Sequence, residues 1–388
     1  MKLLVVLSRV PYPLEKGDKL RAFHQIRCLS KTNDIYLFCL SHQKIDTNVY
    51  KFLGPYCKEI KIVFVSRKEY IGNIIESFLR SEPLQIGYFF SKNARREYLR
   101  FEREVEPDHV YCQFVRTAKL AGDSLIRKTI DYQDALSKNA ERRISKAPFY
   151  LKPILRYEAK KMADYEASVF DMFDTHTIIS DADRDFIQTP FREDIYVIPN
   201  GVDFEFYQPI PDKEKSFDVV FTGNMQYPPN VDAAIFLITK IMPLLWKKNP
   251  QIKVLIAGAN PDSRLMKLKS ERVCVSGWVD DIRESYASAK VFVAPMQIGT
   301  GLQNKLLEAM AMGLPCVTSG LVNKALRATD KREIFVAEKA EEYAATIDLL
   351  LNDETLSSET ALNGCNYVRG RFCWESFCED LNRIFRQE

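Results

Sequence analysis

The amino-acid sequence predicts an α/β protein with two Rossmann-like domains, each built on a doubly wound parallel sheet facing a shared cleft. Three observations support this prediction. Short β-rich apolar runs alternate with longer amphipathic stretches, which is typical of parallel sheets covered by helices on both faces. The length of 388 residues exceeds what one core usually holds. A charged, proline-bearing segment without periodicity, residues 203–216, divides the pattern in two.

The predicted strands fall into two groups. Before the dividing segment they are Lys2–Leu7, Asp34–Leu40, Glu59–Val65, His109–Cys112, Arg127–Tyr132, His176–Ser180 and Asp194–Ile198. After it they are Phe217–Thr222, Ile252–Gly258, Val273–Ser276, Val291–Ala294, Pro315–Thr318 and Ile334–Val336. We therefore expect an N-terminal domain over residues 1–202, a linker over 203–216 and a C-terminal domain over 217–371. The last segment, residues 372–388, reads as an amphipathic helix that crosses back onto the first domain, because the second sheet is complete before it.

Charge is distributed unevenly along the chain. Residues 1–150 hold 27 Lys and Arg against 17 Asp and Glu, a net charge of +10, whereas the whole chain carries +3. A basic N-terminal region suggests an anionic partner such as a phosphorylated acceptor or lipid headgroups, although solvated basic helices explain it equally well. Its aromatic residues show no stacking motif, so nucleic acid is not expected. The nine cysteines are scattered without Cys-x-x-Cys spacing, which favours reduced thiols in a cytoplasmic protein.

The sequence also bears on membranes. The apolar start, Met1–Leu7, is too short for a signal peptide, and we expect no segment of about 20 apolar residues that could span a bilayer. Residues 66–103 combine Arg and Lys with many aromatic and aliphatic side chains. They could lie on an anionic membrane at the inner face of the cell, or they could form a helix that packs on the first sheet.

The most informative segment follows the predicted strand Val291–Ala294. Gly299-Thr300-Gly301 lets the backbone come close to a ligand, and the helix behind it directs free N–H groups toward the same place. Lys305 and Glu308 share one face of that helix. Amides, an ammonium and a carboxylate in this order suit a nucleoside diphosphate, with the carboxylate accepting from the ribose hydroxyls. A solvated Lys–Glu pair in ordinary α/β architecture is the alternative.

Two segments of the first half are candidates for the acceptor side. Gly17, Asp18 and Lys19 follow the first strand and open a helix that also carries Arg21 and His24. The cations could meet a phosphate of donor or acceptor, or Asp18 could simply cap the helix.

The second segment is Asp131–Ser137, which leaves a strand. Asp134 could position the acceptor hydroxyl or stabilise positive charge near the reacting carbon. Capping of the next helix by Asp134 or Ser137 remains equally open. Asp280 and Asp281 stand where a helix begins and are expected to cap it rather than to bind a metal.

Several motifs together resemble a known family, the retaining glycosyltransferases of the GT-B fold in the large family four, and most of all bacterial exopolysaccharide-associated members. The motifs are Pro11–Arg21, Ile198-Pro-Asn-Gly-Val-Asp203, Phe221–Ala233, Val275–Asp281, Ala294–Gly313 and Phe372-Cys-Trp-Glu375. The resemblance runs nearly end to end. It implies transfer of a hexosyl or hexosaminyl group from a nucleotide sugar to a glycan or lipid-linked acceptor.

The resemblance also assigns roles. Glu308 would hold the ribose and Lys305 the diphosphate, without a metal or other cofactor. Backbone at Leu302 and Gln303 would cap the phosphates, and Gly223 would face them from another loop. The loop with Trp278 and Val279 would receive the base. The donor phosphate would take the acceptor proton, so no enzyme nucleophile is implied.

Two positions depart from the family pattern. Thr300 stands where many members have a glutamate that touches the donor hexose, so Gly299–Gly301 would contact the sugar by backbone or hydroxyl. Asn224 stands where the commoner members have an arginine, which leaves Lys305 as the main cation on the diphosphate. These departures keep an inactive nucleotide-sugar-binding partner subunit open as an alternative. A second enzyme alternative is a GT-B-fold nucleotide-sugar epimerase, although such enzymes usually need more acid/base carboxylates and histidines than this chain has.

Overall fold

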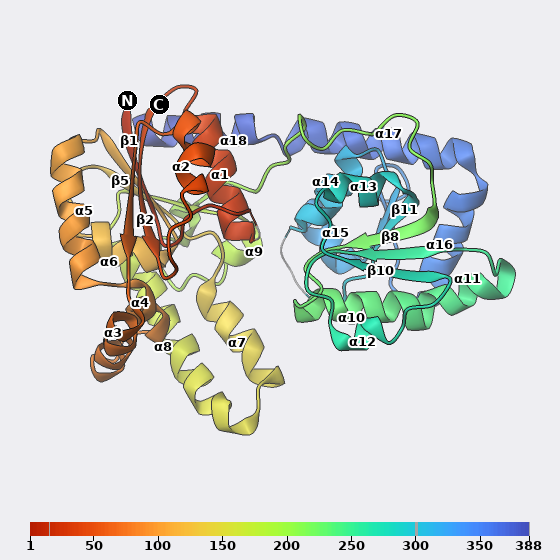
Figure 1. Cartoon of the computed structure of the whole chain (residues 1–388), viewed down its shortest axis with the longest axis horizontal. Helices are drawn as coiled ribbons and strands as arrows, with labels where there is room; N and C mark the ends of the chain where they lie inside the picture. Colours follow the sequence, from red (N-terminus) through yellow and green to blue (C-terminus); the bar gives the residue numbers. More distant parts are fainter. Residues whose placement is uncertain (15, 299–301, 388) are drawn as a thin grey trace. The chain divides into compact units, whose positions relative to one another are not determined.

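A computed structural model of the chain divides into two compact units (Figure 1). Unit 1 comprises Met1–Pro199 and Trp374–Glu388, and unit 2 comprises Asn200–Cys373. The structure describes residues 1–14, 16–298 and 302–387. Within these ranges thirteen strands form one sheet of 7 and one of 6 strands, all paired in parallel. The predicted architecture of two parallel-sheet α/β domains is confirmed, and every predicted strand is present.

The sheet of unit 1 has the order β3-β2-β1-β4-β5-β6-β7. Its strands are β1 (Lys2–Leu7), β2 (Asp34–Ser41), β3 (Glu59–Phe64), β4 (His109–Gln113), β5 (Lys128–Asp131), β6 (Thr175–Ile178) and β7 (Tyr196–Val197). Its helices are α1 (Gly17–Leu29), α2 (Asn48–Leu53), α3 (Arg67–Leu79), α4 (Leu84–Phe89), α5 (Lys92–Val105), α6 (Ala118–Ala121), α7 (Leu136–Lys146), α8 (Lys152–Phe170), α9 (Asp181–Arg184) and α18 (Trp374–Arg386).

Both faces of this sheet are buried, because successive side chains of a strand point to opposite sides. In β1, Leu4 and Val6 join a core with α5 and α8, whereas Leu3, Val5 and Leu7 join a second core with α1 and α18. The terminal helix α18 contributes its apolar stripe to this second core, as predicted. The stripe consists of Trp374, Cys378, Leu381 and Phe385.

The sheet of unit 2 has the order β10-β9-β8-β11-β12-β13. Its strands are β8 (Phe217–Thr222), β9 (Val254–Ala257), β10 (Val273–Gly277), β11 (Ala289–Ala294), β12 (Cys316–Thr318) and β13 (Phe335–Val336). Its helices are α10 (Pro228–Phe236), α11 (Met242–Lys248), α12 (Ser263–Met266), α13 (Ile282–Ala287), α14 (Asn304–Ala311), α15 (Gly320–Leu326), α16 (Ala340–Asn352) and α17 (Glu354–Arg371).

The segment 203–216 is part of unit 2, although the sequence suggests a linker. The guanidinium of Arg283 lies 4.1 Å from the centroid of the Phe206 ring, and that of Arg369 lies 5.3 Å from the Phe204 ring. Aromatic rings spaced irregularly along a charged segment carry no periodicity, so these contacts are invisible in the sequence.

One sequence expectation about membranes needs correction. The continuous helix Pro228–Lys248, formed by α10, a π-helical segment (Leu237–Ile241) and α11, is long and apolar enough to cross a bilayer by length and composition. It connects β8 to β9 in the sheet of unit 2, and 50% of its most apolar window is buried. We therefore interpret it as a core helix of unit 2.

Candidate functional site

Three glycine loops form the floor of the predicted donor side in unit 2. They follow β8, β9 and β10, at the carboxyl edge of the sheet where α/β proteins bind ligands. The N–H of Gly223 donates to the carbonyl of Ala257 over 3.0 Å, and that of Gly258 donates to Gly277 over 3.1 Å. All three glycines have positive φ, +151°, +137° and +76° in chain order. A Cβ on Gly258 would lie 1.8 Å from the Gly223 carbonyl oxygen, so this floor requires glycine.

Lys305 lies directly beside this floor, in the first turn of α14. Its ammonium donates to the side-chain oxygen of Asn230 and lies 5.1 Å from the centroid of the Phe221 ring. No carboxylate reaches it within ion-pair distance in the described ranges. Burial lowers the pKa of Lys305 to about 7, and the nearby Glu308 only partly opposes this shift. A half-buried ammonium without a counter-ion among the described residues is suited to bind an anion.

Glu308 is held by tyrosine hydroxyls rather than by a cation. The Tyr286 hydroxyl lies 2.7 Å from Glu308 Oε2 and 2.8 Å from the Thr222 hydroxyl. Tyr207 also hydrogen-bonds to Glu308. Burial raises the pKa of the Glu308 carboxyl, while both tyrosines and Lys305 oppose the rise. This geometry fixes the orientation of a carboxylate that is suited to accept from a pair of hydroxyls.

The remaining predicted donor residues surround this pair. Trp278 is 67% exposed and follows the left-handed Gly277, so its ring is available for stacking. Asn224 is exposed, and its carbonyl accepts from the Asn230 amide over 3.0 Å. Val279, Leu302 and Gln303 are half-buried, and no side chain of the described residues caps α14. Gly299, Thr300 and Gly301 lie outside the described residues.

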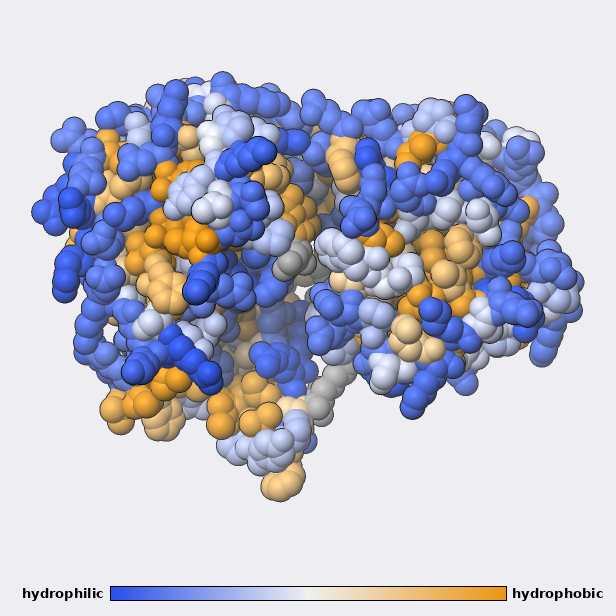
Figure 2. All heavy atoms as spheres, viewed as in Figure 1, coloured by the Kyte–Doolittle hydropathy of each residue, from blue (hydrophilic) through white to orange (hydrophobic). Residues whose placement is uncertain are grey.

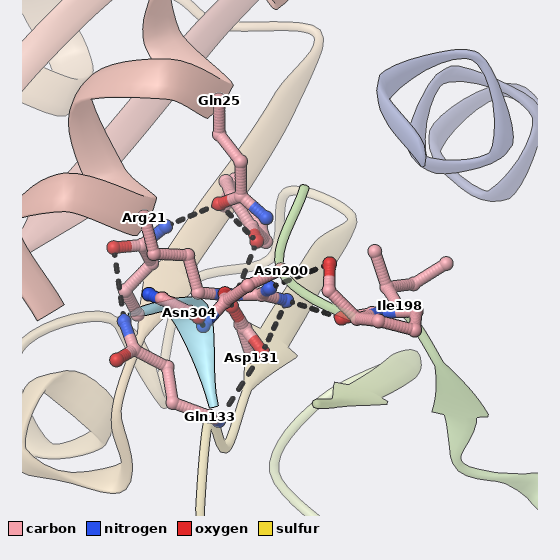
Figure 3. A network of polar contacts seen from close by, with 10 residues as sticks. Arg21, Gln25, Asp131, Gln133, Ile198, Asn200 and Asn304 are labelled. Atoms are coloured by element: carbon pink, nitrogen blue, oxygen red, sulfur yellow. Dashed lines mark hydrogen bonds and ion pairs between the residues drawn. The ribbon is translucent and has the colours of Figure 1, made fainter. Parts of the chain in front are cut away.

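In unit 1 the structure corrects the role predicted for Arg21. Its guanidinium forms an ion pair of 2.7 Å with Asp131, and their side chains are 1% and 0% exposed (Figure 3). It also donates to the carbonyl of Ile198 over 2.9 Å. A guanidinium enclosed in this way has no face left for a phosphate. Arg21 therefore ties α1 to the ends of β5 and β7.

His24 is likewise structural. Its ring is 8% exposed and stacks on Trp374 of α18, with centroids 5.3 Å apart and planes at 14°. It lies in the second core of unit 1 and packs against Phe23 as well. The sequence placed it in the site only because it follows the loop at Gly17.

The other predicted residues, Gly17, Asp18 and Lys19, form the first turn of α1, and two of them line a surface depression. Asp18 and Lys19 border it, together with Arg9 after β1 and Gln133 after β5. Asp18 accepts from Arg9 over 2.7 Å, and a Cβ on Gly17 would find open space. The floor of the depression is connected to the core by buried hydrogen bonds. They run from Gln133 through Gln113 and Gln25 to Tyr111 and Asp131.

Backbone strain marks the same depression. Gln133 and Phe114, which both line it, have φ of +60° and +65° although neither is glycine. Such conformations persist only where the surrounding structure enforces them, and they are concentrated at functional sites.

Asp134 directly follows Gln133 in the chain. Its Oδ2 accepts from Asn139 over 2.8 Å, while Oδ1 is buried with no partner among the described residues. Burial, and then the charge of Asp183, raise its pKa to about 6. The neighbouring Glu166 is buried too, and burial raises its pKa to about 7. Asp134 is not the cap of α7, so the competing capping role is not observed.

Sequence reasoning missed Arg116, which follows β4 beside the depression. It is 9% exposed, and its Nη1 has no partner in the described part of the chain. The guanidinium lies 4.7 Å and 4.4 Å from the ring centroids of Phe89 and Phe114. Burial, and then the like charge of Arg9, lower its pKa to about 10. A single arginine in an apolar-aromatic context has no sequence signal, and two of its partners, Phe89 and Gln85, lie on the distant helix α4.

Residues 216–353 match the protein family described as glycosyl transferases group 1. The matched residues cover most of unit 2, which is therefore similar to domains of this family. Beyond this domain, the chain is 24% identical to an uncharacterized 44.6 kDa protein in the cps region of Klebsiella pneumoniae, over 96% of each chain. It is also 24% identical to the capsular polysaccharide biosynthesis glycosyltransferase CapM of Staphylococcus aureus, over 48% of this chain and 52% of that one.

Solved structures extend the likeness in fold to the whole chain. HepE of Anabaena in complex with UDP-glucose superposes with a TM-score of 0.70, at 13% identity and 100% coverage of both chains. Sucrose-phosphate synthase from Thermosynechococcus elongatus gives a TM-score of 0.72, at 13% identity, over 100% of this chain and 99% of that one. The fold is therefore GT-B, as the resemblance implied.

Proposed function

We propose that this protein is a retaining glycosyltransferase that moves a sugar from a nucleoside diphosphate to a hydroxyl of a glycan or lipid-linked acceptor. The observation that carries the proposal is the pair of side chains on α14. Lys305 is a half-buried cation without a carboxylate partner in the described ranges, and Glu308 is a carboxylate oriented by two tyrosines. Together they supply a positive charge for the diphosphate and a hydrogen-bond acceptor for the ribose hydroxyls.

The chemistry follows from these groups. The bond between the anomeric carbon and the diphosphate oxygen breaks, and Lys305 together with the amides of the first turn of α14 stabilises the negative charge on the leaving group. The acceptor oxygen bonds to the same carbon, and its proton passes to the departing diphosphate. Retention and independence from metal rest on the family resemblance, and a lysine ammonium can supply the charge that a metal would otherwise provide.

Unit 1 would supply the acceptor side. Asp134, whose pKa is raised to about 6, would orient the acceptor hydroxyl or stabilise the oxocarbenium-like transition state. Arg9, Lys19 and the buried Arg116 give this region a positive character that suits an acceptor with a phosphate near the reacting hydroxyl.

A UDP-sugar is the first donor to test, because HepE, whose structure resembles the whole chain, has been crystallised with UDP-glucose. Binding of UDP is measured by calorimetry, and release of nucleoside diphosphate is followed across a donor panel with and without lipid extract. Lys305→Ala should weaken binding and abolish release, whereas Lys324→Ala, on an exposed face of α15, should change neither.

The outcomes separate the competing functions. Release of nucleoside diphosphate together with a new glycoside, of unchanged anomeric configuration, supports the proposal. Binding without release from any donor would identify an inactive partner subunit. A changed sugar configuration without glycoside formation would identify an epimerase. No binding of UDP, GDP or ADP would overturn the proposal altogether.

A further inference from the structure

Unit 1 exposes apolar side chains on two elements that are far apart in sequence. On α3, Ile71, Ile75, Phe78 and Leu79 are 44%, 56%, 58% and 77% exposed. At the turn between α7 and α8, Phe149, Tyr150, Leu151 and Ile154 are 84%, 63%, 39% and 51% exposed. The view in Figure 2 shows apolar side chains gathered at the ends of these same elements. Isolated exposed apolar residues are ordinary, but two adjoining groups of this size indicate a binding surface.

Contacts within unit 1 join the two groups. The Phe78 ring lies 5.4 Å from the Tyr157 ring of α8, and the Tyr157 hydroxyl donates to the carbonyl of Glu82. The Glu158 carboxylate accepts from the backbone N–H groups of Leu84 and Gln85, over 2.7 and 3.0 Å. These bonds attach α8 to the turn between α3 and α4.

The apolar surface is therefore continuous across the two elements. Ile154 and Tyr157 are three residues apart on α8 and share one face, which leads from Phe78 toward the 3₁₀ turn Phe149–Leu151 that runs directly into α8.

The charge around this surface is positive. Residues 136–161, which form α7, the turn and the start of α8, contain eight Lys and Arg against two Glu, a net charge of +6. A hollow of about 370 Å³ between α7 and α8 is bordered by Lys138, Arg156 and Lys160, with Glu141 at its edge. Exposed Arg67 and Lys68 begin α3.

Part of the predicted membrane segment, residues 66–103, turns inward instead. Tyr70, Tyr88 and Phe89 surround His42, with ring centroids 4.4 to 5.5 Å from the imidazole. The alternative of packing on the sheet is therefore correct for these residues. It does not account for the four exposed side chains of α3 or for the α7–α8 turn, which the sequence analysis did not single out.

We propose that α3 and the α7–α8 turn form one surface that docks unit 1 on an anionic lipid bilayer. Aromatic and aliphatic side chains would enter the interfacial layer, and the surrounding lysines and arginines would meet the lipid phosphates. Charge complementarity favours this occupant over a second copy of the chain, whose surface would carry the same +6 segment. The inference does not depend on the donor chemistry, since every residue it uses belongs to unit 1.

Vesicle flotation tests this surface directly. The wild-type protein should float with mixed vesicles of phosphatidylglycerol and phosphatidylcholine at about 0.05 M salt. It should not float with pure phosphatidylcholine vesicles, nor with the mixed vesicles at about 1 M salt. Leu79→Glu combined with Phe149→Glu should lower the bound fraction at least tenfold. Leu362→Glu, which alters a 62% exposed leucine on α17 of unit 2, is the matched control and should leave the bound fraction unchanged.

Three results would overturn the inference. They are an absence of flotation with anionic vesicles, an equal loss in the Leu362 control, and self-association without lipid that the double substitution abolishes. Titration with UDP on the same samples keeps the two proposals distinguishable. Unchanged UDP binding in a protein that does not float rejects the membrane surface alone, whereas flotation without UDP binding rejects the proposed function alone.

Discussion

Arg21 in unit 1 and Lys305 in unit 2 occupy equivalent places in their sequences, yet they have opposite surroundings. Each lies within the first two turns of a helix that follows a strand of its sheet. Arg21 pairs with the buried Asp131 over 2.7 Å, whereas among the described residues Lys305 contacts an amide, an aromatic ring and a thioether but forms no ion pair. The first cation is neutralised inside the fold, whereas the second has no ion-pair partner among the described residues, and we expect it to meet a ligand.

Replacing Arg21 should have the largest effect, and on stability. Arg21→Met leaves Asp131 buried without its partner, which should cost about 3–5 kcal/mol of unfolding free energy in chemical denaturation. Combining it with Asp131→Leu should recover much of this loss, because both buried charges are then removed. Arg96→Met, on an exposed face of α5, is the control. A stable Arg21→Met protein that cannot turn over would contradict the structural role.

Replacing Lys305 should act on catalysis instead. Loss of a donor that stabilises transition-state charge typically lowers kcat by about 10²- to 10³-fold, and we expect this for Lys305→Met. The free energy of unfolding of Lys305→Met should increase, in contrast to that of Arg21→Met. The folded pKa of about 7 lies below the unfolded value, so the unfolded state binds more protons between these values.

The free energy of unfolding of the wild-type protein should consequently rise with pH from about 7 toward 10. Below pH 7 the burial of charged Lys305 should destabilise the fold to its full extent. Lys305→Met lacks this penalty and should melt about 1 °C higher at neutral pH for each kcal/mol gained, in a chain of this length. Melting curves over this pH range, with Lys324→Met as control, check the sign. A lower melting temperature for Lys305→Met would show that Lys305 stabilises the unliganded fold.

The pH dependence of donor binding should be smaller but diagnostic. Above pH 7 Lys305 must take up a proton to meet a diphosphate, while the phosphates, with a second pKa of about 6, are already ionised. The Kd for UDP should therefore increase by up to about tenfold per pH unit above 7. Calorimetry in buffers of different ionisation enthalpy measures the proton uptake. Lys305→Met should show a flat profile, and an equally steep one would assign the proton to another group.

The smallest effect concerns the support of Glu308. Tyr286→Phe removes one of two hydroxyls that orient the carboxylate, and the Tyr207 hydroxyl remains. We expect a roughly five- to tenfold increase in the KM for the donor, about 1 kcal/mol, with little change in kcat. Tyr196→Phe in unit 1 should be neutral. A fall in kcat at unchanged KM would place Tyr286 in the chemical step.

The sequence predicted the site more completely in unit 2 than in unit 1. Lys305, Glu308 and Gly223 lie close together because the loop and the helix that carry them follow neighbouring strands, β8 and β11, of a parallel sheet. The sequence did not identify three supporting residues: Tyr286, which orients Glu308, Tyr207, from a segment that looks like a linker, and Gly258, whose close approach to Gly223 is a tertiary contact. The roles of these residues in donor binding remain predictions.

In unit 1 the sequence identified the segment at Asp18 and Lys19. It could not show which cations near this segment are buried and paired inside the fold. The pairing of Arg21 with Asp131 spans 110 residues, and Arg116 lies between the nearby Phe114 and Phe89, which is 27 residues away on α4. Neither arrangement leaves a local pattern.

The alternation of apolar strands and amphipathic helices was enough to determine the fold of this protein, because burial of both sheet faces imposes a period on the chain. Glycine loops at strand ends were enough to predict where a donor would bind, because only glycine permits such close backbone approach. Which charged side chains are neutralised, which stay available and which apolar side chains reach the surface was decided by the tertiary structure alone. These outcomes depend on residues brought together from distant segments. Whether a charge is neutralised and whether a side chain is buried are decided by the neighbours that a residue acquires on folding.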